Sequence, residues 1–282
     1  LDQAAKEAVQ LVAFGETWLS GYPAWIDHCP GVAVWDDPGM KKAYRQFVDS
    51  AVAIDGEAIQ HVCKLAVEHK TAMVLGINEK VSSGPGNGTV YNTVLIINAS
   101  GEIKVHHRKL MPTFTEKMLY GLGDGGGLAA ADLEFGRVGA LICWEHWMPL
   151  TRQAMHNSGE QIHIALWPQV HEMLQLSSRH YAFEGRCYVL AVGQIMTASQ
   201  IPDALQLPED LAANPDTQIL NGGSAIIGPN GQYTQEPVFG KEELIIATLD
   251  LGKTVEEQMT LDTSGHYQRP DVFTFEVKTP DK

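Results

Sequence analysis

The stretch GALICWEHWMPL (139–150) joins an apolar run to an abrupt change of character. Small and aliphatic residues lead up to Cys143, and large side chains with polar tips follow directly after it. A short apolar run of this kind predicts a strand buried on both faces, as in a sheet covered by helices. Cys143 would then lie at a strand end, where the functional sites of α/β proteins gather.

Similar apolar runs recur along the chain and predict strands over 11–14, 71–77, 93–99, 138–143, 162–167, 187–193, 222–228 and 243–250. Apolar residues at helical spacing predict a helix over 55–70 with Asp55 as its N-cap, and further helices over 150–159 and 177–187. Glycine-rich segments at 84–88 and 228–231 indicate hairpin tips, and the one at 121–127 indicates a turn. Together these elements predict one α/β domain over 1–282, with two packed mixed sheets and helices outside.

Composition excludes several classes of protein. The chain of 282 residues is 44% hydrophobic and carries a formal net charge of -14 without any Lys/Arg cluster, which argues against a nucleic-acid partner. Its four cysteines are widely and irregularly spaced, which indicates neither a zinc site nor a disulfide framework. No apolar stretch reaches the roughly 18 residues of a membrane span, and no secretory signal is visible. These features predict a cytoplasmic protein with reduced thiols.

The first ten residues raise a separate question. LDQAAKEAVQ (1–10) has the small apolar face of a helix, yet the strand LVAF (11–14) follows without turn residues. A helix and a strand normally need a connection of about 2–6 residues. Either the helix is very short or residues are absent between Gln10 and Leu11, and we favour the second interpretation.

Four residues beside predicted strand ends are candidates for chemistry, although each has an ordinary explanation. A cysteine at the end of an apolar strand is usually a packed thiol, and the lysine in HHRKLMPTFTE (106–116) is usually a solvated charge. Glu116 would ordinarily be an acid at a helix start, whereas Glu16 emerges from a buried strand and must be paired or functional. A nucleophilic Cys143 needs a base, and His146 is a weak candidate because a Cys-x-x-His pair need not converge.

Taken together, VAFGETWLSGYP (12–23), HHRKLMPTFTE (106–116) and LICWEHWMPL (141–150) resemble, in that order, the three signature blocks of the nitrilase branch of the carbon-nitrogen hydrolase superfamily. The resemblance continues through WPQVHE (167–172), SSRHYAFEGRCYVL (177–190), GGSAIIGPNG (222–231) and GHYQRPDVF (265–273), and so covers most of the chain. One departure is Gly15, where the family usually has proline before the acidic residue. Another is the short N-terminal part, since family members begin with a strand and a full helix before the first block.

The resemblance implies a four-layer α-β-β-α sandwich and a catalytic set of Glu16, Lys109 and Cys143, with Glu116 as a fourth member. Glu16 would take the proton of Cys143, Lys109 would stabilise developing negative charge, and Glu116 would hold Lys109 in place. By resemblance, the substrate-binding candidates are Tyr22, Tyr120, Trp144, His146 and Trp147. No metal or organic cofactor is implied, and the expected assembly is a homodimer that extends into larger homo-oligomers or spirals.

The expected reaction is hydrolysis of small organic nitriles to carboxylic acid and ammonia through a thioimidate and a thioester on Cys143. Amidases and carbamoyl-amide hydrolases share the Glu-Lys-Cys set, so these residues alone do not choose the bond that is cleaved. A cyanide-degrading enzyme is a narrower variant. A non-catalytic assembly protein is a different class, but it would have no need for all three residues.

Overall fold

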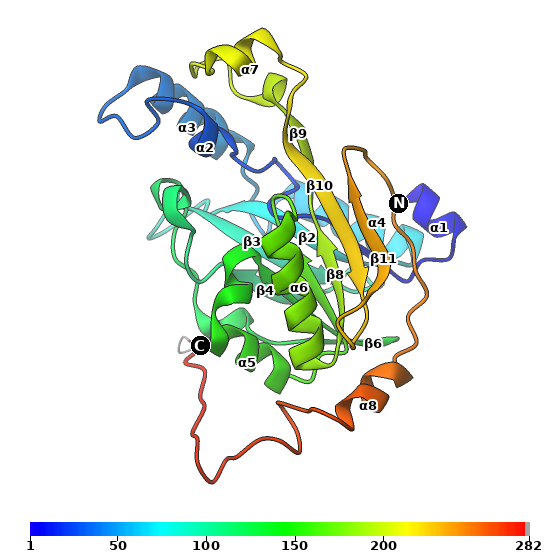
Figure 1. The fold of residues 1–282 in the computed structure, drawn as a ribbon. Coiled ribbons are helices and arrows are strands. Elements are labelled where there is room, and N and C mark those ends of the chain that lie inside the picture. The colour runs from blue at the N-terminus through cyan, green and yellow to red at the C-terminus, as the bar shows by residue number, and fades with distance from the viewer. Residues whose placement is uncertain (280–282) are drawn as a thin grey trace.

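The apolar runs of the sequence pair into two β-sheets, shown in Figure 1 for the computed structural model, which describes residues 1–279. The first sheet has the order β1-β2-β3-β4, formed by β1 (Leu11–Ala13), β2 (Ala72–Lys80), β3 (Val90–Ile97) and β4 (Ile103–Arg108). β1 runs parallel to β2, and β2, β3 and β4 pair antiparallel. The predicted hairpin tip at 84–88 joins β2 to β3 and is confirmed.

The second sheet has the order β11-β10-β8-β7-β6-β5, and β9 pairs with β10 beside this path. Its strands are β5 (Ala131–Leu133), β6 (Gly136–Ile142), β7 (Ile162–Leu166), β8 (Tyr188–Val192), β9 (Ile195–Thr197), β10 (Gln218–Ile227) and β11 (Tyr233–Phe239). β6, β7 and β8 are parallel, and they are the central strands that the near-continuous apolar runs predict. The predicted hairpin at 228–231 joins β10 to β11.

Helices cover both outer faces of the paired sheets. The helices of the described residues are α1 (Asp2–Lys6), α2 (Trp25–His28), α3 (Pro38–Ser50), α4 (Glu57–His69), α5 (Pro149–Asn157), α6 (Glu172–Gly185), α7 (Glu209–Ala213) and α8 (Gly252–Gln258), with 3-10 turns η1 (Phe114–Met118), η2 (Gly125–Gly127), η3 (Cys143–Trp147) and η4 (Ala198–Gln200). α4 packs through Ile59 and Ala66 on the first sheet, and α5 and α6 lie against the second (Figure 1). The four-layer α-β-β-α arrangement is therefore confirmed.

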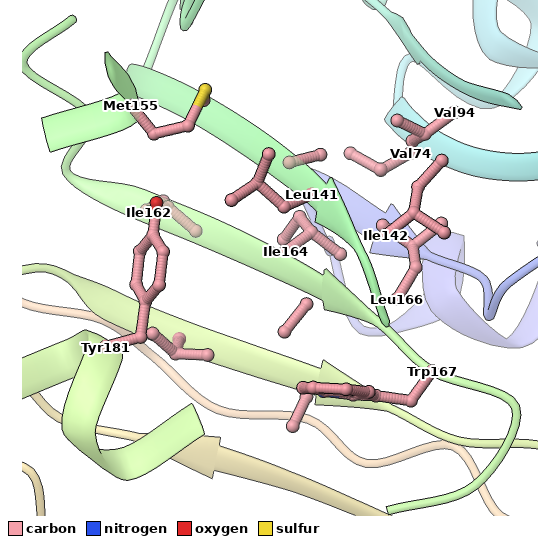
Figure 2. Close-up of a cluster of buried hydrophobic side chains, with 14 of the residues drawn as sticks. Val74, Val94, Leu141, Ile142, Met155, Ile162, Ile164, Leu166, Trp167 and Tyr181 are labelled. Carbon is pink, nitrogen blue, oxygen red and sulfur yellow. The ribbon is translucent and has the colours of Figure 1, made fainter. Parts of the chain in front are cut away.

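The largest core cluster fills the space between the sheets and beneath α5 and α6. Ile142 of β6 lies near Val74 and Val94 of the first sheet, while Met155 and Tyr181 project from the helices (Figure 2). All five side chains are fully buried. Burying apolar area at roughly 25 cal/mol per Å² makes this cluster a main source of stability. It also fixes the end of β6, from which Cys143 emerges.

One predicted strand is wrong. Residues 243–250 run extended without pairing in a ladder, although ELIIATLD has the composition of a buried strand. Together with β1 and β8 they line a cavity of about 330 Å³, and Leu244 and Ile246 are partly exposed. Strand propensity alone does not form a strand, because a ladder also needs a neighbour with free backbone groups.

Local details at helix starts also differ from expectation. Gly56 is the N-cap of α4, and Asp55 makes no capping bond. The helix over 38–50 has no counterpart among the predicted elements; it begins with Pro38 after Asp37, whose carboxylate accepts a bond from the Met40 N–H at 2.7 Å. At the N-terminus, α1 is a very short helix and four residues connect it to β1, with Ala8 at φ 52°.

Within residues 1–279, no helix is both long and apolar enough to cross a membrane.

Candidate active site

Cys143 lies where β6 ends and the chain turns into η3. Its backbone has φ 51°, in the left-handed region that residues with a Cβ rarely enter. Such strain persists only where surrounding contacts hold the residue in place, and it clusters at functional sites.

The turn leaves Cys143 5% exposed. Burial raises the pKa of the thiol well above its usual range, the nearby Glu16 raises it further, and Lys109 opposes the shift. Cys143 therefore rests as a neutral thiol.

Glu16 follows β1 and is completely buried. Its Oε1 accepts hydrogen bonds from Lys109 Nζ at 2.9 Å and from Asn92 Nδ2 at 2.7 Å. Its Oε2 has no hydrogen-bond partner among the described residues. Burial raises the pKa of this carboxyl to about 7, against the lowering effect of Lys109. Glu16 can therefore exchange a proton near neutral pH through a free oxygen.

Lys109 follows β4 and carries a buried ammonium between two carboxylates. Its Nζ donates to Glu16 Oε1 at 2.9 Å and to Glu116 Oε2 at 2.7 Å. Burial alone would lower its pKa, but the surrounding anionic groups raise it well above the usual value. A buried charge is stable only when it is paired and hydrogen-bonded in this way. Lys109 is thus a permanent cation with fixed geometry.

Glu116 lies in η1 and completes the charged cluster. Its Oε2 accepts the Thr113 backbone N–H at 2.8 Å as well as the Lys109 bond, and its Oε1 accepts the hydroxyl of Tyr22 at 2.9 Å. Two of these bonds stay within the segment 109–116 and hold the lysine in place, and the third joins that segment to Tyr22. The four predicted catalytic positions come from three segments of the chain, because Lys109 and Glu116 share the segment that follows β4, and ion pairs or close charges link them into one cluster.

The predicted substrate-binding residues other than His146 differ in what they contact. Tyr22 contacts the cluster through Glu116, whereas the Tyr120 hydroxyl donates to Asn78 Oδ1 at 2.7 Å. Trp144 directly follows Cys143 and is half exposed, and Trp147 packs against Trp144 with ring centroids 6.3 Å apart. A role of these four side chains in substrate binding stays a prediction.

His146 lies in the core of the second sheet and is 1% exposed. Its Nδ1 is 2.7 Å from the carbonyl oxygen of Cys143, which can only accept, so Nδ1 donates. Its Nε2 is 3.0 Å from Nε2 of His163, and its ring stacks on Trp167. Burial and then the neighbouring His163 lower its pKa to about 3, so the ring is neutral. Both ring nitrogens thus serve internal hydrogen bonds, and neither is available to the thiol or to a substrate.

Sequence reasoning missed two side chains that position Glu16. Asn92 interrupts the apolar run of β3, and its amide donates to the carboxylate; a polar residue inside such a run is the signal that could have revealed it. Gln194 donates from Nε2 to the Glu16 carbonyl at 2.6 Å. A Cβ on Gly15 would lie 2.7 Å from Gln194 Cγ, so glycine at this position makes room for that side chain. Nothing in the local sequence around Gln194 indicates this contact.

The cluster combines a thiol, a carboxyl with a near-neutral pKa and a fixed ammonium. Such a set can form a covalent bond to an electrophilic carbon, move the thiol proton and stabilise developing negative charge. Among residues 1–279, no group of three or more His, Cys, Asp or Glu side chains is arranged to hold a metal ion.

Comparison with known proteins adds independent information. The carbon-nitrogen hydrolase family model matches residues 1–257. A protein named nitrilase 2, from an unknown prokaryotic organism, is 37% identical over 277 residues, which cover 98% of this chain and 83% of the relative. A bifunctional nitrilase/nitrile hydratase of Lupinus angustifolius is 34% identical over 284 residues, covering 99% of this chain and 79% of the relative. In fold, the chain is similar to a carbon-nitrogen hydrolase from Helicobacter pylori, with a TM-score of 0.69, 20% identity and coverage of 96% and 87% of the two chains.

Proposed function

The chain belongs to the carbon-nitrogen hydrolase family, and on that basis we propose that it hydrolyses small organic nitriles to carboxylic acids and ammonia. The observation that carries the proposal is the buried cluster of Cys143, Glu16, Lys109 and Glu116. The choice of nitriles is supported by relatives at 34–37% identity that are named nitrilases and match along nearly the whole chain.

In the first step, the thiol of Cys143 adds across the carbon–nitrogen triple bond. Its proton passes to the free Oε2 of Glu16 while the sulfur bonds to the nitrile carbon, and Glu16 then returns the proton to the nitrogen. Negative charge develops on that nitrogen, and the Lys109 ammonium stabilises it. The product is a thioimidate on Cys143, with Glu16 again a carboxylate. Because the resting thiol holds its proton tightly, transfer and attack are expected to be concerted.

In the second step, water adds to the thioimidate carbon while Glu16 takes one of its protons. Delivery of that proton to the nitrogen gives a tetrahedral intermediate with one hydroxyl and one amino group. The hydroxyl proton then passes through Glu16 to the amino group, the carbon–nitrogen bond breaks as the carbonyl forms, and ammonia leaves a thioester on Cys143. A second water attacks this thioester with Glu16 again as the base. The carbon–sulfur bond breaks, the sulfur recovers its proton, and the carboxylic acid is released.

An amide is the product when the tetrahedral intermediate expels sulfur before ammonia. The Lupinus angustifolius relative is named for both activities, so mixed products are a specific alternative to test. An amidase or carbamoyl-amide hydrolase would use the same four residues, beginning from a carbonyl carbon. A cyanide-degrading enzyme would differ only in the size of its substrate.

Matched nitrile and amide pairs separate these alternatives. Purified protein is incubated with each member, and ammonia, acid and amide are quantified while mass spectrometry follows the adduct on Cys143. We expect ammonia and acid from the nitrile and a mass shift confined to Cys143. Ammonia from the amide together with none from the nitrile would show that the chain is an amidase.

We also propose that the enzyme acts on its small-molecule nitrile as a homo-oligomer, with a dimer as the unit of larger assemblies. Light scattering at several protein concentrations tests this directly. A monomer that is active at every concentration would contradict it, and assembly without turnover would favour the scaffold alternative.

A further inference from the structure

Glu145 is a buried carboxylate with no part in the steps above. It lies in η3 two residues after the nucleophile and is 1% exposed. Its Oε2 accepts the backbone N–H of Ile142 at 2.8 Å, and its Oε1 accepts the backbone N–H of Leu110 at 2.9 Å. Both oxygens are also 3.0 Å from Nε2 of His107, which is completely buried.

The two backbone groups bound by Glu145 adjoin catalytic residues. Ile142 directly precedes Cys143, and Leu110 directly follows Lys109. The first lies at the end of β6 in the seven-stranded sheet, and the second follows β4 of the four-stranded sheet. One side chain therefore joins the two chain segments that carry the nucleophile and the ammonium, across the boundary between the sheets.

The bonding pattern requires an ionised carboxylate. The two backbone N–H groups donate one to each oxygen, so both oxygens act as acceptors, and an ionised carboxylate can also accept from Nε2 of His107 in the tautomer that carries a proton there. Burial opposes ionisation, but His107 and the two N–H donors lower the pKa of Glu145 below its usual range. A glutamine side chain at this position has the same size but offers one oxygen and one NH₂ group. Its NH₂ group would face a backbone donor and leave that donor unsatisfied.

We propose that Glu145 is a positioning residue that sets the placement of Cys143 relative to Lys109. The role rests on the proposed reaction, because that reaction needs the sulfur and the ammonium at one substrate atom. Displacing reacting groups by about 1 Å can reduce a rate by roughly 100-fold. The effect should therefore fall on turnover and leave substrate affinity nearly unchanged.

The first test compares Glu145→Gln with Glu145→Asp and with a matched control, Glu79→Gln. Glu79 is also a buried carboxylate, but it bonds to side chains of Thr93, His106 and Arg108 and to no backbone group beside the nucleophile or the lysine. Active sites are counted from the mass of alkylated Cys143, so that loss of folded protein does not distort kcat. We expect kcat to fall about 100-fold in Glu145→Gln with KM within about twofold.

Glu145→Asp keeps the charge but is one methylene shorter, so it can reach only one of the two segments. We expect it to lose at least about tenfold in kcat, and it carries the test if the glutamine variant does not fold. The control should keep most of its kcat per active site. Wild-type kcat in Glu145→Gln or in Glu145→Asp, or an equal loss in the control, would overturn the proposal.

The second test does not depend on the substrate. Alkylation of Cys143 by iodoacetamide is followed against pH in the wild type and in Glu145→Gln. With Glu16 as the base, the wild-type rate should rise with a midpoint near pH 7, the pKa of Glu16. A displaced thiol should instead follow its own ionisation, which burial moves to a pH well above the usual range of a cysteine. Equal midpoints would refute the positioning role even if no nitrile or amide proves to be a substrate.

Discussion

At the scale of single residues, the protonation state of Glu16 governs the proposed chemistry. Its pKa is raised to about 7 by burial, whereas Lys109 stays charged and Cys143 stays neutral through this range. Since the base must be a carboxylate to accept the thiol proton, kcat/KM should rise as pH increases through about 7. A pH–rate profile measures this. An acidic limb near pH 4.5, the ordinary value of a glutamate, would show that burial does not raise the pKa of the base as expected for Glu16.

Cys143→Ala removes only the sulfur at a residue that β6 and η3 already hold in place. We expect turnover to fall below detection while the circular dichroism spectrum is unchanged. The strained backbone at φ 51° remains in the variant, so no large gain or loss of stability follows from that source. Ammonia release that survives the substitution would exclude covalent catalysis by this thiol.

His146→Asn provides the contrast. An asparagine Nδ2 can occupy nearly the position of the imidazole Nδ1 and donate to the Cys143 carbonyl, so the nucleophile keeps its support. We expect kcat within about tenfold of wild type, with a loss of stability of about 1–3 kcal/mol because His163 loses a buried partner. Activity as low as that of Cys143→Ala would restore His146 as a candidate base.

At this scale, resemblance of motifs predicted the four clustered residues, and the structure brings them together. It could not predict Asn92 or Gln194, because their contacts to Glu16 depend on how strands distant in sequence approach one another. It also listed His146 among the substrate-binding candidates, whereas the fold gives both ring nitrogens internal partners. Sequence neighbours share a segment, but only the fold decides which way each side chain points.

At the scale of elements, Gly76 of β2 supports the turn that carries Glu16. A Cβ at this position would overlap the Gly15 carbonyl oxygen and the Thr17 backbone nitrogen. Gly76→Ala should therefore push that turn away, with a stability loss of about 1–3 kcal/mol and a marked loss of kcat. Urea unfolding and turnover, measured on the same preparation, test this. The variant Gly88→Ala serves as a control for activity: a Cβ there meets nothing within 4 Å, and the φ of 87° costs stability by backbone strain away from the site.

Periodicity predicted the strands and helices with strong patterns, including β6, β7 and α4, because each buries a face that the pattern describes. It failed for 243–250, where the composition is that of a strand but the chain lacks a ladder. Pairing is a property of two segments, so one segment alone cannot establish it. The N-cap of α4 differs from the prediction for another reason: Gly56 is one residue past Asp55, and a sequence pattern places a helix boundary only to within one or two residues.

At the scale of the whole molecule, buried carboxylates set the response to acid. The pKa values of Glu79, Glu160 and Glu184 lie at about 2, because hydrogen bonds and ion pairs outweigh burial. Their stabilisation is complete above about pH 4.5, the unfolded value, and is lost as pH falls toward 2. Glu16 has the opposite effect, because its pKa is raised in the folded state. It lowers the free energy of unfolding as pH rises from about 4.5 to about 7.

We therefore expect the free energy of unfolding to drop steeply between pH 4.5 and 2. Urea denaturation followed by tryptophan fluorescence at several pH values measures it. In Glu160→Gln, which removes one of the three groups, the slope against pH should be smaller. Equal stability at pH 5 and pH 3 in the wild type would contradict the expectation.

Two carboxylates around one ammonium also bear on how the product leaves. When Glu16 is ionised, the buried cluster of Glu16, Glu116 and Lys109 carries one net negative charge. A nitrile enters without charge, but a carboxylic acid formed there ionises and meets an anionic wall in a poorly screened interior. Electrostatic repulsion then drives the acid out and keeps accumulated acid from returning, whereas a neutral amide experiences no such force. The charges of this cluster are therefore expected to speed release of the acid and to weaken its inhibition of the enzyme, while the equilibrium of the reaction is unchanged.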